Sequence, residues 1–90
     1  MSNSKIEQLE CMLRLKNVDC EDILLVTTYS RGRVVGYFNG VDIANNQLRL
    51  TDNYPVYEWN IFNNIPADDI KIINIVYRNV CYDFEKYAVN

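Results

Sequence analysis

The sequence contains no histidine, and its 90 residues include only three cysteines, three glycines and two prolines. Histidine is the commonest general base and the commonest metal ligand in proteins, so its absence argues against acid–base catalysis and against a metal centre. The cysteines, Cys11, Cys20 and Cys81, are odd in number and have no Cys-x-x-Cys spacing, which indicates neither a disulfide framework nor a zinc site. We therefore expect a protein that is not an enzyme and that uses no metal and no cofactor.

Long apolar runs are also missing from the chain. No stretch approaches the roughly 20 consecutive apolar residues that a membrane-spanning helix needs. Residues 1–4 provide neither the basic start nor the apolar stretch of a secretory signal peptide. These absences predict a cytoplasmic protein that does not associate with a membrane.

An excess of positive charge is the third absence. Nine lysines and arginines stand against twelve acidic residues, which gives a net charge of −3, whereas a general nucleic-acid binder is usually basic. The segment 23–50 departs from this balance, because it holds Arg31, Arg33 and Arg49 against the single acid Asp42. Any anion-binding site is therefore expected in this segment.

What is present suits one small globular domain, since 49% of the residues are apolar and 23% are charged. Ser4 and Glu7 have the spacing of a capping box, and Ile6 and Leu9 begin an apolar stripe at helical spacing. These signals predict an N-terminal helix over about residues 5–15.

Beyond the helix, β-forming residues and period-two alternation dominate. They predict five strands, or six if the last segment pairs, over residues 23–29, 33–41, 48–51, 56–62, 70–77 and 80–84. Gly32 provides the turn between the first two strands. Short strands in close succession favour a small barrel over about residues 22–77, followed by a C-terminal extension over 78–90.

Two of these segments have distinctive faces. The segment Val56–Phe62 places Tyr57, Trp59 and Ile61 on one face of an expected strand. The segment Ile70–Tyr77 is apolar on both faces, so it needs cover on both sides, either inside a barrel or at a contact between subunits.

Barrels of this size take SH3-like, OB or Sm-like forms, and one motif distinguishes among them. A hydrophobic strand is followed by a Gly-Arg turn, a strand ending in Gly-x-apolar, an Asp, and an Asn before a Leu-x-Leu strand. In this chain the run is Ile23–Tyr29, Gly32-Arg33, Gly36-Tyr37-Phe38, Val41-Asp42, Asn45-Asn46 and Leu48-Arg49-Leu50. The motif and the order of elements resemble the Sm-like family, which includes the Sm and LSm proteins and the bacterial chaperone Hfq. The resemblance covers about residues 5–77 and implies a mainly β, five- to six-stranded Sm-like (SH3-like) barrel with an N-terminal α-helix.

The resemblance also implies assembly and a ligand. Sm-like proteins pair the fourth strand of one subunit with the fifth of the next, in rings of about five to seven copies. Asp42 and one of Asn45 or Asn46 match positions of the family's RNA pocket. The family's second motif is altered, because Pro66-Ala67 stands where Arg-Gly is usual, and Ala44 stands near the usual base-stacking aromatic.

The candidate ligand-binding residues are Arg31, Arg33, Tyr37, Asp42, Asn45 and Asn46. The arginines flank a turn where guanidinium groups and free amides can meet a phosphate. The carboxylate and the two amides can bind the edge of a base, and the tyrosine ring can stack on one. The alternative interpretation is structural: solvated turn arginines, an Asx turn and an aromatic packed in the core.

Three functional hypotheses follow. The first is a non-enzymatic ring that binds a nucleotide-type ligand, either short single-stranded RNA or a small signalling nucleotide, linear or cyclic. The acidic balance favours the small ligand, since long RNA binds through many neutralised phosphates. Twelve asparagines suggest an AT-rich genome, and a phage protein that sequesters an immune-signal nucleotide would resemble viral sponge proteins in size and acidity. The alternatives are an acidic module that binds or inhibits a host protein, and a purely scaffolding ring.

Overall fold

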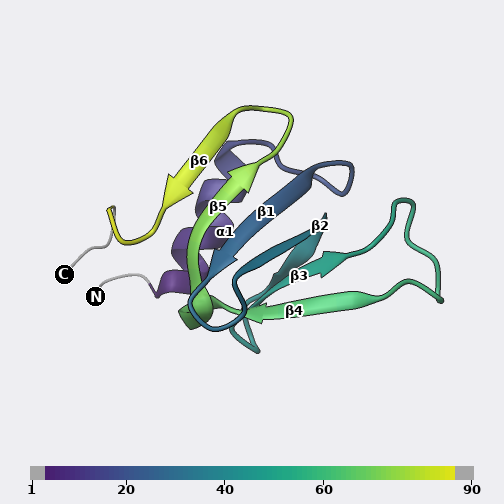
Figure 1. Ribbon diagram of the computed structural model, residues 1–90, viewed down its shortest axis with the longest axis horizontal. Helices are drawn as coiled ribbons and strands as arrows, with labels where there is room; N and C mark the ends of the chain where they lie inside the picture. Colours follow the sequence, from purple (N-terminus) through teal and green to yellow (C-terminus); the bar gives the residue numbers. More distant parts are fainter. Residues whose placement is uncertain (1–3, 87–90) are drawn as a thin grey trace.

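The structure is a computed structural model that describes residues 4–86, and Figure 1 shows its elements. They follow the chain as α1 (Lys5–Leu15), β1 (Ile23–Thr28), β2 (Arg33–Asp42), β3 (Gln47–Thr51), β4 (Phe62–Pro66), the 3-10 turn η1 (Ala67–Asp69), β5 (Ile70–Ile75) and β6 (Val80–Asp83). The predicted N-terminal helix is confirmed with the expected bounds. The expected mainly β composition is confirmed as well.

Helix α1 begins where its capping residues require. The Ser4 hydroxyl accepts a hydrogen bond from the Glu7 backbone N–H and donates one to the Glu7 carboxylate at 2.9 Å. These contacts satisfy a backbone donor that the first turn would otherwise leave unpaired. The buried side of the helix, Ile6, Leu9 and Leu13, then packs into the core.

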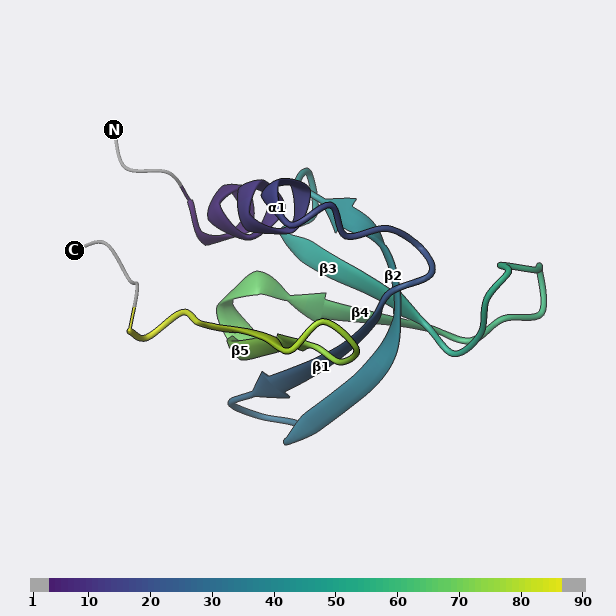
Figure 2. The same cartoon turned by 90° about the horizontal axis from the view of Figure 1, so that it is seen from above.

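The six strands form one antiparallel sheet in the order β4-β3-β2-β1-β5-β6. Strands β4 and β6 each have a neighbour on one side only, so the sheet is open in the part of the chain that is described. The predicted closed barrel is therefore not confirmed. The sheet twists strongly, and α1 covers the core on one side (Figure 2).

The core combines the two halves of the sheet. Leu24 and Val26 of β1 face Ile75 and Ile73 of β5, while Leu48 of β3 faces Ile65 of β4. All of these side chains are fully buried or nearly so, together with the apolar face of α1. The sheet and the helix thus share one hydrophobic core.

The predicted strand over Val56–Phe62 is wrong. Residues 52–61 form the long connection between β3 and β4, and the strand occupies Phe62–Pro66 instead. The core explains the difference, because Ile65 is fully buried opposite Leu48, whereas Ile61 is largely exposed. Filling the core at Ile65 sets the register of the strand.

The C-terminal part of the sheet differs from the expectation in two respects. Strand β5 ends at Ile75, and Tyr77 lies exposed in the following turn. The last segment does pair, as β6 (Val80–Asp83), so both edges of β5 have neighbours, β1 and β6. The predicted extension over 78–90 therefore begins with a strand of the sheet, and its end, residues 87–90, lies outside the described residues.

Candidate functional site

Three of the predicted site residues lie in the turn between β2 and β3. The Asp42 carboxylate accepts hydrogen bonds from the Asn45 backbone N–H at 3.2 Å and from the Asn45 side-chain amide at 2.8 Å. Asn46 has a φ of 58°, and its carbonyl accepts a hydrogen bond from the Ala67 N–H at 2.9 Å. This is an Asx turn, in which the side chains stabilise the backbone that carries them.

The same contacts affect the charge of the turn. The side-chain and backbone hydrogen bonds from Asn45 lower the pKa of Asp42 below its ordinary value, and the nearby Arg49 guanidinium lowers this pKa further. Asp42 is therefore a carboxylate at neutral pH, with Asn45 as its main partner. A base edge would have to compete with Asn45 for this carboxylate.

Arg31 is held by a second built turn, between β1 and β2. Its backbone N–H donates to the Thr28 hydroxyl oxygen at 2.8 Å, and Gly32 takes the φ of 72° that the turn requires. The Ser30 hydroxyl donates to Asp69 at 2.6 Å and ties the turn to η1. From this position the Arg31 guanidinium reaches the backbone carbonyl of Asn64 in β4, at 3.4 Å.

A second arginine, Arg49, lies beside Asn64 of β4. Arg49 of β3 lies directly opposite Asn64 in the sheet, and its guanidinium lies 5.9 Å from the centre of the Phe62 ring. The Nε atom of Arg49 is buried and has no hydrogen-bond partner among the residues that the structure describes. We call the group formed by Arg31, Arg49, Phe62 and Asn64 the arginine face. Because this atom has no exposed surface, an acceptor from a ligand would satisfy it only after the Arg49 side chain moves.

The remaining two predicted site residues lie elsewhere. Arg33 is exposed at the start of β2. Tyr37, also on β2, pairs with Thr51 and places its ring 6.3 Å from that of Tyr54, beside the β3–β4 connection. The structure thus groups Asp42, Asn45 and Asn46 in one turn, and it gives Arg33 and Tyr37 no place in that group.

Three residues of the arginine face were not predicted as site residues: Arg49, Phe62 and Asn64. A signal for Arg49 was available, because the alternation of Leu48 and Leu50 predicts that the intervening side chain lies on the opposite face of the strand. No such signal exists for Phe62 and Asn64, since the sequence pattern places Phe62 at the end of the predicted strand 56–62 and Asn64 between two predicted strands.

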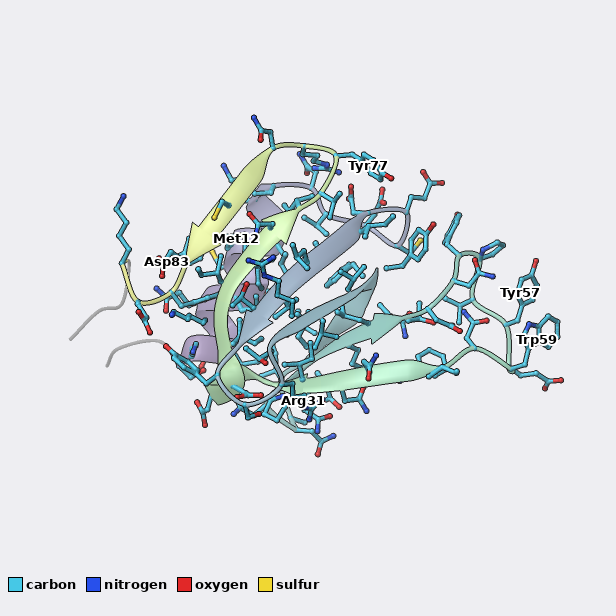
Figure 3. The ribbon with its side chains drawn as sticks, in the orientation of Figure 1. Met12, Arg31, Tyr57, Trp59, Tyr77 and Asp83 are labelled. Atoms are coloured by element: carbon cyan, nitrogen blue, oxygen red, sulfur yellow. The ribbon has the colours of Figure 1, made fainter. Side chains whose placement is uncertain are left out.

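The β3–β4 connection has a built structure of its own. The Asn60 side-chain amide donates to the Thr51 hydroxyl and to the Asn53 carbonyl, both at 2.9 Å, and its oxygen accepts from the Tyr57 N–H at 3.0 Å. Asn60 is buried, yet the rings of Tyr57 and Trp59 stack on each other at 4.7 Å between centroids and point into solvent. We call residues 52–61 the aromatic hairpin; Figure 3 shows both rings at its tip.

Other chemistry finds little support in residues 4–86. No group of three or more cysteine and acidic side chains is placed to hold a metal ion there, and Cys11, Cys20 and Cys81 are free thiols. None of the helices in this range has the length and apolar character that a bilayer crossing requires.

Comparison with known proteins found no matching family model, no matching curated protein and no matching solved structure.

Proposed function

We propose that this chain is a non-enzymatic, Sm-like, ring-forming protein that binds a nucleotide-type ligand on the arginine face. The ligand is short single-stranded RNA or a small signalling nucleotide, with its phosphate at Arg31 and Arg49. Asp42, Asn45 and Asn46 lie at the end of the β2–β3 hairpin, where a base or sugar extending from that phosphate would compete with Asn45 for the Asp42 carboxylate.

The position of Arg31 and Arg49 beside Asn64 carries this proposal. The Nε of Arg49 is buried and has no partner among the described residues, so a phosphate would satisfy it once the side chain turns toward the ligand. A buried guanidinium nitrogen without an acceptor costs free energy, and a phosphate oxygen is the acceptor that a guanidinium binds best. Arg31 supplies a second guanidinium next to the same residue of β4, Asn64. Two guanidinium groups and one aromatic ring suit a phosphate with an attached base.

The Sm-like interpretation is supported by the order of the elements. A helix precedes the strands, η1 separates β4 from β5, and β5 returns to pair with β1 at the far side of the sheet. In this chain β6 covers the other edge of β5. The ring that we propose therefore pairs β4 of one copy with β6 of the next, rather than β4 with β5.

The charge of the protein favours a small ligand over long RNA. The net charge is −3 per chain, so a ring of about six copies carries a charge of about −18, and that charge repels an extended polyanion. A compact ligand held by two arginines per copy avoids most of this repulsion. The same chemistry suits a phage protein that sequesters a signalling nucleotide in the bacterial cytoplasm.

Binding measurements with defined probes test the proposal. Isothermal titration with a cyclic dinucleotide, a linear dinucleotide and a hexauridylate RNA should give saturable binding for at least one of them. Arg31→Ala and Arg49→Lys should weaken it by roughly 10- to 100-fold, which corresponds to a lost charge-assisted hydrogen bond of about 1.5–3 kcal/mol.

The matched control is Arg14→Ala, because Arg14 is an exposed arginine on α1 with only a distant ion pair to Glu10. This variant should bind like the wild type. If none of the probes binds, or if all three variants bind equally, the arginine face is not the site. Capture of a host protein without nucleotide binding would then support the alternative, an acidic protein-interaction module.

A further inference from the structure

The aromatic hairpin exposes apolar side chains that nothing in the described chain covers. Trp59 is 70% exposed and Ile61 is 66% exposed, and Val56 and Tyr57 are both 43% exposed. The exposure does not come from a loose loop, since Asn60 and the hydrogen bonds around it hold the connection in shape. Several exposed apolar side chains on a structured projection are typical of a contact site.

A groove that could receive this tip lies between α1 and β6. Its volume is about 500 Å³. The lining residues are Gln8, Cys11, Met12, Leu15, Lys16, Val80, Cys81 and Tyr82. The side chains are mostly apolar, and Leu15 at the rim is 73% exposed. A groove of this character and size suits a large aromatic side chain.

The hairpin cannot reach the groove of its own chain. The two features lie at opposite ends of the molecule, whose longest dimension is 40 Å. Figure 3 shows Trp59 at one end of the molecule and Met12, which lines the groove, well away from it. A contact between them therefore requires a second copy of the chain.

The charges of the two features are complementary. Glu58 stands between Tyr57 and Trp59 in the sequence, at the tip of the hairpin, and Lys16 is the only charged side chain among the described residues that line the groove. Neither side chain forms an ion pair within residues 4–86. The hairpin sequence 52–61 contains two acids and no base. This charge disfavours a phosphate backbone as the partner of the hairpin and favours an apolar groove that carries one cation.

We infer that the aromatic hairpin of one copy inserts into the α1–β6 groove of the next copy, with Glu58 facing Lys16. The hairpin leads into the edge strand β4, and the groove is bounded by the other edge strand, β6. A β4–β6 pairing and a hairpin–groove contact would therefore join the same two copies. Such a head-to-tail contact closes a ring or continues as a filament. The inference rests on the self-assembly part of the proposed function and not on nucleotide binding.

Charge reversal tests the contact. Glu58→Lys and Lys16→Glu should each weaken self-association about tenfold. The double variant should restore it, because the ion pair is then present with its two charges exchanged. Trp59→Ala should weaken association at least as much. Val35→Ala, an exposed apolar residue on β2, is the control and should assemble like the wild type. Sedimentation velocity over a concentration series gives these association constants.

Cross-linking locates the contact. Glu58→Cys, oxidised under mild conditions, should form a disulfide with Cys81 of a neighbouring copy, identified by peptide mass mapping. The native Cys20 is exposed and does not line the groove, so it is the internal control and should not be captured. Equal capture of Cys20 and Cys81 would overturn the inference, as would failure of the double charge reversal to restore assembly.

The outcomes separate the two claims. A wild-type oligomer that is indifferent to Trp59, Glu58 and Lys16 would overturn the hairpin contact and leave the ring intact. A wild type that stays monomeric would overturn both the ring and the hairpin contact. Loss of hexauridylate binding on Trp59→Ala, with assembly unchanged, would show instead that the hairpin stacks on nucleic acid. Titration of the assembled variants with the nucleotide probes tests the arginine face separately.

Discussion

Arg78 connects the β5–β6 turn to the segment between α1 and β1, which is far away in sequence. Its guanidinium donates to both Asp22 carboxylate oxygens, at 3.1 and 2.7 Å, and to the backbone carbonyls of Lys16 and Asn17 at the end of α1. Lys16 is the C-cap of the helix and Asn17 follows it, so these carbonyls lie just past the point where helical donors end. One side chain in the β5–β6 turn thus fixes the end of α1 and the approach to β1.

Replacing Arg78 tests this role. Arg78→Ala should lower the free energy of unfolding by about 1–2 kcal/mol, because the hydrogen bonds involve a charge but the side chain is about one-third exposed. Urea denaturation followed by circular dichroism measures the change. Arg14→Ala, which removes an exposed arginine 3.9 Å from Glu10, should cost less than about 0.5 kcal/mol. Equal losses in the two variants would contradict this account.

Asp42 makes the stability of the fold depend on pH in the acid range. Folding lowers the pKa of Asp42, chiefly through hydrogen bonds from Asn45, so the folded state favours the carboxylate more than the unfolded chain does. This contribution is complete above the unfolded pKa and is lost as the pH falls below it. The urea midpoint of Asp42→Asn should therefore lie below that of the wild type at neutral pH, and the gap should narrow below about pH 4. A gap that stays constant with pH would show that the carboxylate contributes no such stabilisation.

At the candidate site, contacts between near neighbours in sequence were predictable, and contacts between residues far apart in sequence were not. The grouping of Asp42 with Asn45 follows from their spacing, because an Asx turn is a contact between near neighbours in sequence. The approach of Arg31 to Asn64 joins residues 33 positions apart and depends on the twist of the sheet. Nothing in the sequence pattern determines that distance.

At the scale of the elements, the β3–β4 region is the most informative. Tyr57, Trp59 and Ile61 alternate as a strand would, yet they lie in a connection, because Asn60 binds across the loop and closes it as a hairpin. The other strands and the helix were predictable, because their alternation or helical spacing matches the residues that face the core. The pattern in residues 56–62 misled because the exposed aromatics have the same period as a buried face.

Paired substitutions test where β4 lies. Ile65→Ala should lower the free energy of unfolding by about 2–5 kcal/mol, since its side chain is fully buried against Leu48. Ile61→Ala should change it by less than about 0.5 kcal/mol, because Ile61 is mostly exposed. Equal costs for the two variants in urea denaturation would contradict the register of β4.

A substitution at Gly36 tests the close approach of β2 to β3. A Cβ at this position would lie 2.9 Å from the Thr51 backbone carbonyl oxygen and 3.0 Å from the Leu50 Cβ, so the strands would have to move apart. Gly36→Ala should cost about 1–3 kcal/mol of stability. Gly32→Asn is the control, because that site is open and asparagine tolerates its φ of 72°. Thermal unfolding of both variants measures the difference in stability. An unchanged stability of Gly36→Ala would contradict the close approach of Gly36 to the Thr51 backbone.

The whole molecule presents two unlike ends. One end has the edge strand β4 and the aromatic hairpin, and the other has the edge strand β6 and the α1–β6 groove. Open strand edges and exposed aromatic side chains favour association in a soluble protein. If the two ends bind each other, as we propose, the copies assemble head to tail, and that geometry is compatible with a ring.

Native mass spectrometry of the purified protein, with and without added nucleotides, tests the central claim most directly. It reports the number of copies and the mass of any bound ligand in one measurement. We expect a discrete closed oligomer of about five to seven copies that gains a small, stoichiometric nucleotide mass per copy. A monomer at every concentration, with no added mass from any nucleotide, would contradict both the ring and the ligand.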